Sequence, residues 1–336
     1  MSTIKNVLNG KEKSCRPIWF MRQAGRHLPE FRKIRSKNNN FIKLCLDSDL
    51  SSEITLQPIQ RYDLDAAIIF SDILLVPYAL GQEVNFVKNE GPNLTKFNLK
   101  NFLNNSKEKF TDKLLPIYKA IGKTKKKLNK DKTLISFIGA PWTLLVYMLN
   151  LKEGKNEINL NLVNDNKNQI NTILNILNEF LCLHIENQIN AGADIVQIFD
   201  SWAGLIPQED LTDYCYNPNL KIVKFCKENS IPVISFPRGI KEKYKEFNSI
   251  VKPNGINLDY EINPLWAKEN LGNVILQGGM NPKVLLESNE KIFDEAKKYL
   301  DIFKDTPYIF NLGHGLIPET NPDKLSKLIK FIRNYK

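Results

Sequence analysis

Arginine is concentrated in one short part of this sequence. The 336 residues include arginines at positions 16, 22, 26, 32, 35, 61, 238 and 333, and most of these fall between residues 16 and 35. A guanidinium group is planar, permanently charged and able to bind carboxylate or phosphate through two parallel hydrogen bonds. The cluster therefore predicts a site for an anionic ligand. A solvated helix face is the alternative for these arginines, although Gly25 disfavours a plain surface helix around Arg22 and Arg26.

Three polar residues each follow an apolar run at the same distance. Asp72, Ser201 and His314 come two residues after runs that end at Phe70, Phe199 and Leu312. If these runs are parallel strands of a barrel, their carboxyl ends lie together and the three side chains share one site. Capping of a following helix is the alternative for Asp72 and Ser201. His314 stands between two glycines that would leave it exposed, which favours a functional role over packing.

A fourth candidate follows another apolar run. Gly139-Ala140-Pro141-Trp142-Thr143 predicts the end of a strand and the start of a helix, because proline favours the first helical turn. Tyr147 would then lie on the same helix face as Thr143. A half-buried core aromatic is the alternative for Tyr147. His184 lies in an apolar helical pattern and is expected in the core or on a dimer surface.

Short β-branched or aromatic runs alternate with longer helical patterns along the chain. The predicted strands are 17–20, 66–70, 134–138, 195–199, 232–236, 255–258, 274–277 and 308–312, and the clearest helical pattern is 170–189. This rhythm predicts a single (β/α)8 barrel domain over residues 1–336, with an arginine-rich substrate-binding segment at 16–35. A doubly wound nucleotide-binding sheet is disfavoured, because no glycine-rich phosphate-binding motif follows a predicted strand.

Two segments interrupt this rhythm. Residues 84–99 predict a hairpin around Glu90-Gly91-Pro92, and residues 150–171 are rich in asparagine and lysine. Both are expected to be surface loops, with flaps near a site as the alternative.

Composition and cysteine spacing argue against several classes of protein. Hydrophobic residues make up 42% and charged residues 25%, as in soluble globular proteins. No apolar run reaches the roughly 18 residues of a membrane helix, and the charged first fifteen residues do not form a secretory signal, so we expect a cytoplasmic protein without a membrane partner. The five scattered cysteines lack a Cys-x-x-Cys pair, and the three histidines form no His-Glu-x-x-His motif, which argues against a disulfide framework or a metal site.

The net charge of +10 raises the possibility of a nucleic-acid partner. The excess is mostly lysine, and the richest run, 123–132, has no interleaved aromatic side chains on which bases could stack. A solvated helix face is the simpler interpretation, so no nucleic-acid partner is expected.

Several of these segments together resemble a known family. Residues 17–26 (PIWFMRQAGR) and 28–31 (LPEF) closely resemble the N-terminal signature of the uroporphyrinogen decarboxylase family, and residues 139–144 (GAPWTL) with Tyr147 resemble its second signature. Residues 70–74 (FSDIL), 197–201 (QIFDS) and 312–315 (LGHG) resemble its other site segments in the same order. The resemblance covers residues 17–322.

The resemblance implies a fold and an activity. It implies a distorted (β/α)8 barrel, a homodimer, and removal of the four acetate carboxyl groups of uroporphyrinogen III to give coproporphyrinogen III, with no cofactor and no metal. Asp72 would bind the inner pyrrole N–H groups, and Arg22, Arg26 and Arg35 would hold substrate carboxylates. Tyr147, Ser201 and His314 would contact the pyrrole being processed. The catalytic residues implied are Asp72, Arg22, Tyr147 and His314, and the matched motifs add Gln23, Ala24, Phe70 and Phe199 to the substrate-binding set.

The chemistry of such a reaction agrees with the residue types. Loss of carbon dioxide from a pyrrole acetate leaves a carbanion, and prior protonation of the ring creates a cation that accepts its electrons. An ionised Asp72 suits stabilisation of that cation. Arg22 suits an electrostatic anchor. The family's usual candidate for the proton donor is also Arg22, but the very high pKa of a guanidinium makes it a poor donor unless its environment is unusual.

Three positions depart from the family pattern. His27 stands where Tyr is common and is expected to add a titratable group near the entrance of the site. Ser136 stands in place of Gly, and Asn150-Leu151 in place of Glu-Gly, which leaves the shape of the loop after the second signature open.

Two competing hypotheses remain. A zinc methyltransferase of the same superfamily would need a His-x-Cys pair, which residues 235–239 (SFPRG) lack, while Cys182 and His184 would point to different faces of a helix. A nucleic-acid-binding protein is supported only by the sequence pI of about 9.1.

Overall fold

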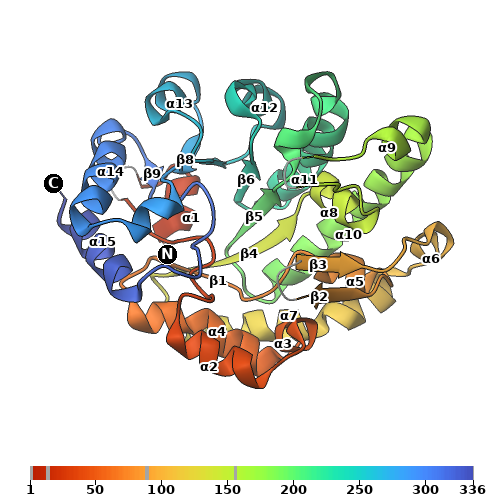
Figure 1. The fold of residues 1–336 in the computed structure, drawn as a ribbon, viewed down its shortest axis with the longest axis horizontal. Coiled ribbons are helices and arrows are strands. Elements are labelled where there is room, and N and C mark those ends of the chain that lie inside the picture. Colours follow the sequence, from red (N-terminus) through yellow and green to blue (C-terminus); the bar gives the residue numbers. More distant parts are fainter. Residues whose placement is uncertain (1–2, 13–15, 88–90, 155–156, 336) are drawn as a thin grey trace.

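Seven parallel strands form one curled sheet in the computed structural model, which describes residues 3–12, 16–87, 91–154 and 157–335. The strands, in their spatial order, are β1 (Ala66–Ile68), β4 (Thr133–Gly139), β5 (Ile195–Asp200), β6 (Val233–Pro237), β7 (Gly255–Leu258), β8 (Ile275–Gly278) and β9 (Tyr308–Ile309). Helices alternate with the strands and surround the sheet (Figure 1). The predicted barrel class, built from βα units, is confirmed.

The helices are α1 (Thr3–Leu8), α2 (Pro29–Lys37), α3 (Phe41–Cys45), α4 (Ser48–Arg61), α5 (Leu75–Ala79), α6 (Leu99–Leu103), α7 (Lys107–Lys127), α8 (Pro141–Met148), α9 (Asn161–Asp165), α10 (Lys167–Asn190), α11 (Asn217–Glu228), α12 (Tyr244–Val251), α13 (Pro264–Asn270), α14 (Asn289–Ile302) and α15 (Pro322–Asn334). The helix predicted at 170–189 is therefore confirmed within α10. None of the helices in the described ranges has both the length and the apolar character needed to cross a membrane.

The predicted hairpin is also present. Strand β2 (Val84–Val87) pairs antiparallel with β3 (Gly91–Leu94), with Val84 opposite Leu94, and residues 88–90 of its turn lie outside the described residues. The asparagine- and lysine-rich segment 150–171 is less irregular than expected, since it contains α9 and the first turn of α10.

The strand predicted at residues 17–20 is wrong as a regular element. Ile18 forms only a single parallel bridge, to Phe310. Pro17 has no amide hydrogen to donate to a ladder, and side chains accept two of the amide hydrogens that follow: the Ile18 N–H donates to Asp65 Oδ2 over 2.6 Å, and the Phe20 N–H donates to Gln23 Oε1 over 2.9 Å. Side-chain oxygens thus accept hydrogen bonds that the carbonyl groups of a neighbouring strand would accept in a regular sheet.

Residues 17–20 nevertheless join the two edges of the curled sheet. On one side Phe310 donates its N–H to the Pro17 carbonyl over 2.8 Å, next to β9. On the other side Asp65, the residue before β1, donates its N–H to the Ile18 carbonyl over 2.9 Å. The eighth position of the barrel is therefore filled by an irregular segment.

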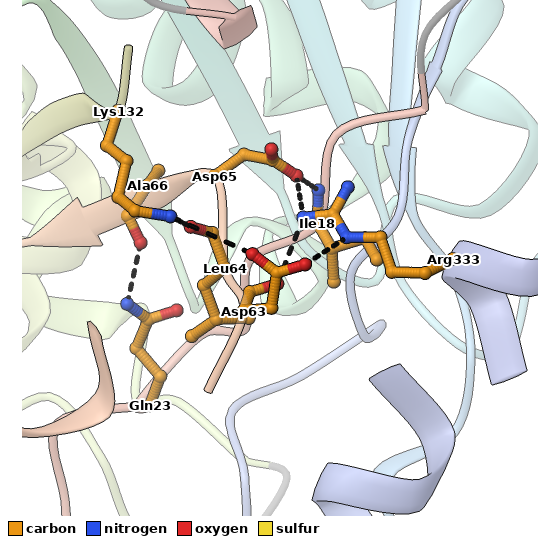
Figure 2. A network of polar contacts seen from close by, with 8 residues as sticks. All are labelled: Ile18, Gln23, Asp63, Leu64, Asp65, Ala66, Lys132 and Arg333. Carbon is orange, nitrogen blue, oxygen red and sulfur yellow. Dashed lines mark hydrogen bonds and ion pairs between the residues drawn. The ribbon is translucent and has the colours of Figure 1, made fainter. Parts of the chain in front are cut away.

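A polar network fixes this closure (Figure 2). The carboxylate of Asp65 accepts from both the Ile18 N–H and Arg333 Nη2, the latter over 2.7 Å, and Arg333 comes from the last helix, α15. Arg333 also bonds the side chain and carbonyl of Asp63, and Lys132 donates to the Leu64 carbonyl. The start of β1 is thus held by groups from both ends of the chain.

The interior of the barrel contains a separate apolar cluster. Where a strand contributes two residues to this cluster, they are two positions apart, as expected of side chains that point to one face of the sheet. The strand residues are Ala66 and Ile68, Ile135, Ile195, Ile234 and Phe236, and Ile309. Helix α1 adds Ile4, Val7 and Leu8, so its apolar face closes one end of the interior.

Buried amides form a polar layer inside the same barrel. Gln277 donates to the side-chain oxygens of Asn257 and Gln197 and accepts from the Trp19 indole N–H, with donor–acceptor distances of 2.7, 3.1 and 2.8 Å. Each of these four side chains is fully buried. These buried hydrogen bonds fix the relative positions of β5, β7, β8 and residues 17–20.

Candidate active site

The predicted site residues come together at the carboxyl ends of the strands. Asp72 follows β1, Ser201 follows β5, His314 follows β9, and Tyr147 lies in α8, directly after β4. Arg22 follows residues 17–20, the segment that closes the barrel. Its positive charge interacts with the ionisable groups of Asp72, Tyr147 and His314. Sequence positions almost 300 residues apart in the chain therefore build one site.

Asp72 combines a structural contact with a carboxylate held in an unfavourable environment. Its Oδ1 accepts the Leu74 N–H over 2.9 Å in the turn before α5, and α5 itself has no side-chain cap, so the capping alternative is not realised. Its Oδ2 has no hydrogen-bond partner among the described residues. Burial raises the pKa of Asp72 to about 6, against the opposing effects of the Leu74 N–H and the Arg22 charge. Asp72 is therefore mostly ionised at pH 7 and carries one free oxygen.

The loop that carries Asp72 is anchored on α4. Ser51 donates its hydroxyl to the Phe70 carbonyl over 2.7 Å, and the Phe70 N–H donates to Thr55 Oγ1 over 2.8 Å. The Phe70 ring packs on Phe31 and Phe41, with centroid separations of 5.5 and 5.9 Å. Phe70 is buried in these contacts and fixes the backbone two residues before Asp72.

Arg22 stands in a strained backbone conformation. Its φ of 62° lies in the left-handed region that non-glycine residues rarely adopt outside constrained sites. The flanking residues impose this conformation: the Met21 N–H donates to Asn311 Oδ1 over 3.0 Å, and Gln23 Nε2 donates to the Ala66 carbonyl over 2.8 Å. Gln23 is fully buried, and its side chain holds the backbone next to Arg22.

The Arg22 side chain packs directly on a glycine. A Cβ placed on Gly315 would lie 2.4 Å from Arg22 Cδ and 2.7 Å from Cγ, so only glycine leaves room for this contact. Burial and the nearby charge of Arg26 lower the pKa of Arg22, while Asp72 acts in the opposite direction. Since much of the Arg22 side chain is also exposed, its guanidinium is partly enclosed by protein and still open to a ligand.

His314 is held by the same glycine segment. The Gly315 N–H donates to His314 Nδ1 over 2.7 Å, so the neutral ring carries its hydrogen on Nε2. Burial, together with the charges of Arg22 and Arg238, lowers the pKa of His314 to about 4. At pH 7 His314 is therefore a neutral hydrogen-bond donor.

A buried carboxylate supports Tyr147 and Ser201. Asp200, at the end of β5, accepts from Thr143 Oγ1 over 2.7 Å and from Asn219 Nδ2 over 3.1 Å. The same Thr143 oxygen accepts the Trp202 N–H over 3.2 Å. The Trp202 ring packs on Tyr147 with a centroid separation of 6.0 Å. Tyr147 is half-buried, and burial raises its pKa, with a further contribution from Asp72.

The remaining predicted residues differ in their surroundings. Arg26 is exposed, and its guanidinium has no hydrogen-bond or ion-pair partner within the described chain, whereas Arg35 donates to the Asn38 carbonyl and lies 5.7 Å from the centre of the Phe41 ring. Ala24 is half-buried next to Arg22. Phe199 is half-buried and packs on Phe137 and Phe236 beside the barrel interior.

The expectation for His27 is wrong. Its side chain is 1% exposed and stacks on Tyr62, and burial lowers its pKa to about 4. It is therefore a neutral core residue and not a titratable group at an entrance. His184 is likewise in the core, where Nδ1 meets the Tyr118 hydroxyl at 2.9 Å.

Two of the positions that depart from the family pattern, near the second signature, form hydrogen bonds with neighbouring segments. Ser136 is buried and donates to the Ile195 carbonyl over 3.2 Å. Asn150 adopts a φ of 51° just after α8, and its Nδ2 donates to the Leu94 carbonyl of the hairpin over 3.3 Å. Within the part of the chain that the structure describes, no three His, Cys, Asp or Glu side chains cluster as metal ligands would.

Sequence reasoning missed three residues that shape the site. Arg238 follows β6 and acts electrostatically on both Arg22 and His314. Asp200 and Asn311 hold neighbouring site residues through buried hydrogen bonds. The same rule that found Asp72 and His314, a polar residue directly after an apolar run, also fits Asp200 and Arg238.

Comparisons with known proteins agree on one family. A model of the family "Uroporphyrinogen decarboxylase (URO-D)" matches residues 1–335. The chain is 42% identical to uroporphyrinogen decarboxylase of Orientia tsutsugamushi strain Ikeda, over 100% of this chain and 99% of that protein. It is 40% identical to the enzyme of the same name from Rickettsia felis, over 99% and 97% of the two chains.

Solved structures agree on the fold. A methyltransferase from Methanosarcina mazei superposes with a TM-score of 0.78 over 98% of this chain and 96% of that one, at 16% identity. That likeness concerns the fold alone, whereas the sequence matches extend over the site segments. The chain belongs to the uroporphyrinogen decarboxylase family.

Proposed function

We propose that this chain removes the acetate carboxyl groups of uroporphyrinogen, and that Asp72 stabilises the cation through which each carboxyl group is lost. Decarboxylation of uroporphyrinogen, a carboxy-lyase reaction of haem biosynthesis, is the activity that membership of the family gives. The observation that carries the role of Asp72 is its carboxylate, mostly ionised at pH 7, with one oxygen free and with Arg22 and Tyr147 near it.

The reaction needs an electron sink and a counter-charge. Protonation of a pyrrole ring carbon gives a cation whose positive charge extends to the ring nitrogen. The bond to the carboxylate then breaks, carbon dioxide leaves, and the bonding electron pair flows into the ring. Protonation of the released methylene and loss of the added ring proton leave a methyl group and restore the pyrrole. The net change is replacement of a carboxylate by a proton.

Asp72 can supply the negative charge that stabilises this cation, because its environment favours interaction with a positive charge. Burial disfavours the isolated carboxylate, as its raised pKa records. A positively charged pyrrole beside Oδ2 would relieve that cost, so Asp72 interacts more strongly with the cation than with the neutral substrate. An interaction that strengthens toward the transition state is the kind that accelerates a reaction.

The other site residues hold the anionic side chains of the substrate. Arg22 and Arg26 offer guanidinium groups without carboxylate partners among the described residues, and His314 offers its Nε2 hydrogen. The lowered pKa of Arg22 is also the direction that proton donation requires. Tyr147 and Ser201 line the same ends of the strands and contact the pyrrole being processed, with Phe199 beneath it at the barrel interior.

Three further assignments belong to this proposal. The chain forms one catalytic barrel domain over residues 1–336, with residues 16–35 as its substrate-binding segment. The protein works in the cytoplasm as a homodimer. The family resemblance supports the single barrel and the homodimer, and the contacts of residues 17–20 with β1 and β9 support the integration of the arginine segment into the barrel.

The proposal is tested by anaerobic incubation with uroporphyrinogen III and separation of the products by carboxyl number. Wild type, treated with chelator, should yield coproporphyrinogen. Asp72→Asn keeps an oxygen for the Leu74 N–H but loses the charge, and should lower kcat by about 100- to 1000-fold. Asp112→Asn, which removes an exposed carboxylate of α7, is the matched control and should retain full activity.

The outcomes separate two claims. If wild type leaves uroporphyrinogen unchanged, the assignment of the reaction fails. If wild type is active and Asp72→Asn is equally active, only the role of Asp72 fails.

A further inference from the structure

The guanidinium groups of three of the eight arginines have no hydrogen-bond or ion-pair partner within the described chain. Arg61 and Arg333 form ion pairs with carboxylates, Arg32 and Arg35 donate to backbone carbonyls, and Arg16 lies over the Tyr335 ring. The remaining three are Arg22, Arg26 and Arg238. Arg22 and Arg26 are exposed and Arg238 is half-buried, so all three guanidinium groups are open to a ligand, and unpaired positive charges this close together indicate an anionic ligand that pairs with them.

The backbone of Arg238 is fixed beside Ser201. Pro237, the last residue of β6, pairs with Asp200 of β5, and the Arg238 N–H donates to the Asp200 carbonyl over 3.1 Å. In return the Gly204 N–H donates to the Arg238 carbonyl over 2.8 Å. The segment after β5 and the segment after β6 are therefore bonded on both sides of Arg238.

The residue after Arg238 tightens the same junction. Gly239 has a φ of 82°, and its N–H donates to Asp259 Oδ2, beyond β7, over 2.8 Å. A Cβ on Gly204 would lie 2.6 Å from the Gly239 carbonyl carbon, so the two segments are in direct backbone contact. Arg238 thus projects from a rigid junction between β5, β6 and β7, and the flexibility of a surface loop does not explain why it is unpaired.

The charge of Arg238 reaches the site. It contributes to lowering the pKa of both Arg22 and His314, after burial in each case. Together with the backbone bonds to Asp200 and Gly204, this places Arg238 beside Ser201, at the part of the site that holds Arg22 and His314.

We propose that Arg238 is a further substrate-binding residue, which pairs with a carboxylate of the porphyrinogen at the β6 side of the site. This rests on the proposed function. Its basis is the rigid placement of an unpaired guanidinium beside Ser201. A tetrapyrrole carries carboxylates on every side of its ring, so a ligand centred on Asp72 presents one to the β6 side.

The first test compares Arg238→Met, Arg238→Lys and a control, Lys245→Met, in steady-state decarboxylation of uroporphyrinogen III. Lys245 is exposed on α12, the helix that follows the same junction, and the control removes the same charge. Arg238→Met should raise KM by about 10- to 100-fold with kcat little changed, and Arg238→Lys by a smaller factor. Lys245→Met should change neither. An unchanged KM in Arg238→Met, or a loss confined to kcat, overturns the proposal.

A binding measurement makes the test independent of turnover. Uroporphyrin and coproporphyrin, which are aromatic and stable in air, are titrated into each variant and followed by their fluorescence. Weaker binding of both to Arg238→Met identifies a propionate as the partner, because coproporphyrin retains only propionates. Weaker binding of uroporphyrin alone identifies an acetate. Equal binding of both porphyrins to Arg238→Met and wild type overturns the proposal even if the enzyme decarboxylates uroporphyrinogen normally.

Discussion

Replacing Asp72 by Asn should make the protein more stable while it removes activity. The carboxylate is held where burial disfavours its charged form, and its pKa of about 6 compares with a reference value of 3.8. Because the pKa is raised on folding, the folded state binds the proton more tightly than the unfolded state. The contribution of Asp72 to the free energy of unfolding is therefore most favourable below pH 3.8, and it is lost as the pH rises from 3.8 to about 6.

The size of the effect follows from that interval. A shift of about two pKa units corresponds to roughly 3 kcal/mol, and this value already contains the opposing attraction of Arg22. An asparagine at position 72 pays no ionisation penalty, and its side-chain oxygen can still accept the Leu74 N–H. We expect Asp72→Asn to be about 2 to 3 kcal/mol more stable than wild type at pH 7, and equally stable near pH 4.

Urea denaturation of both proteins between pH 4 and pH 8 measures this difference. The buried carboxylate of Asp200 also has a pKa raised to about 6, but it is common to both proteins and cancels. Asp112→Asn controls for the change in net charge. A difference in the free energy of unfolding that does not vary with pH, or a variant less stable than wild type at pH 7, would refute the reasoning.

Three further predictions concern the supports of the site. Gly315→Ala would place a methyl group against the Arg22 side chain and should lower kcat/KM by about 10-fold or more while circular dichroism and Tm stay near wild type. Thr143→Val removes a hydrogen bond from the buried Asp200 and should cost about 1 to 3 kcal/mol, measured by urea denaturation at pH 7. Arg333→Met should cost about 1 kcal/mol, and the loss should shrink in 1 M salt because its ion pairs are partly exposed.

Local patterns were sufficient to predict most of the strands and the side chains that follow them. The apolar run at 195–199 corresponds to β5, and the run at 255–258 is β7 as predicted. Strands of a barrel end at one face, so a polar residue directly after such a run is placed at the site by topology alone. This reasoning needs no knowledge of tertiary contacts, and it located Asp72 and His314.

Features that depend on distant partners were not predictable in the same way. Residues 17–20 have a strand-like composition, yet the Ile18 amide hydrogen goes to the side chain of Asp65, whose position only the fold determines. Whether an arginine is paired is equally a tertiary property, which is why the sequence grouped Arg32 with Arg22 and overlooked Arg238. His27 is buried for the same reason, since its stacking on Tyr62 joins positions 35 residues apart in the numbering.

The closure of the barrel has a consequence for how this protein is made. Arg22 leaves the ribosome early, but the segment that carries it is fixed between β1 and β9, and the network that secures it includes Arg333 near the other end of the sequence. A nascent chain therefore has no complete site until β9 and α15 have been synthesised. A product cut short before residue 308 keeps an uncovered sheet edge beside β8, which favours pairing with another chain over partial activity.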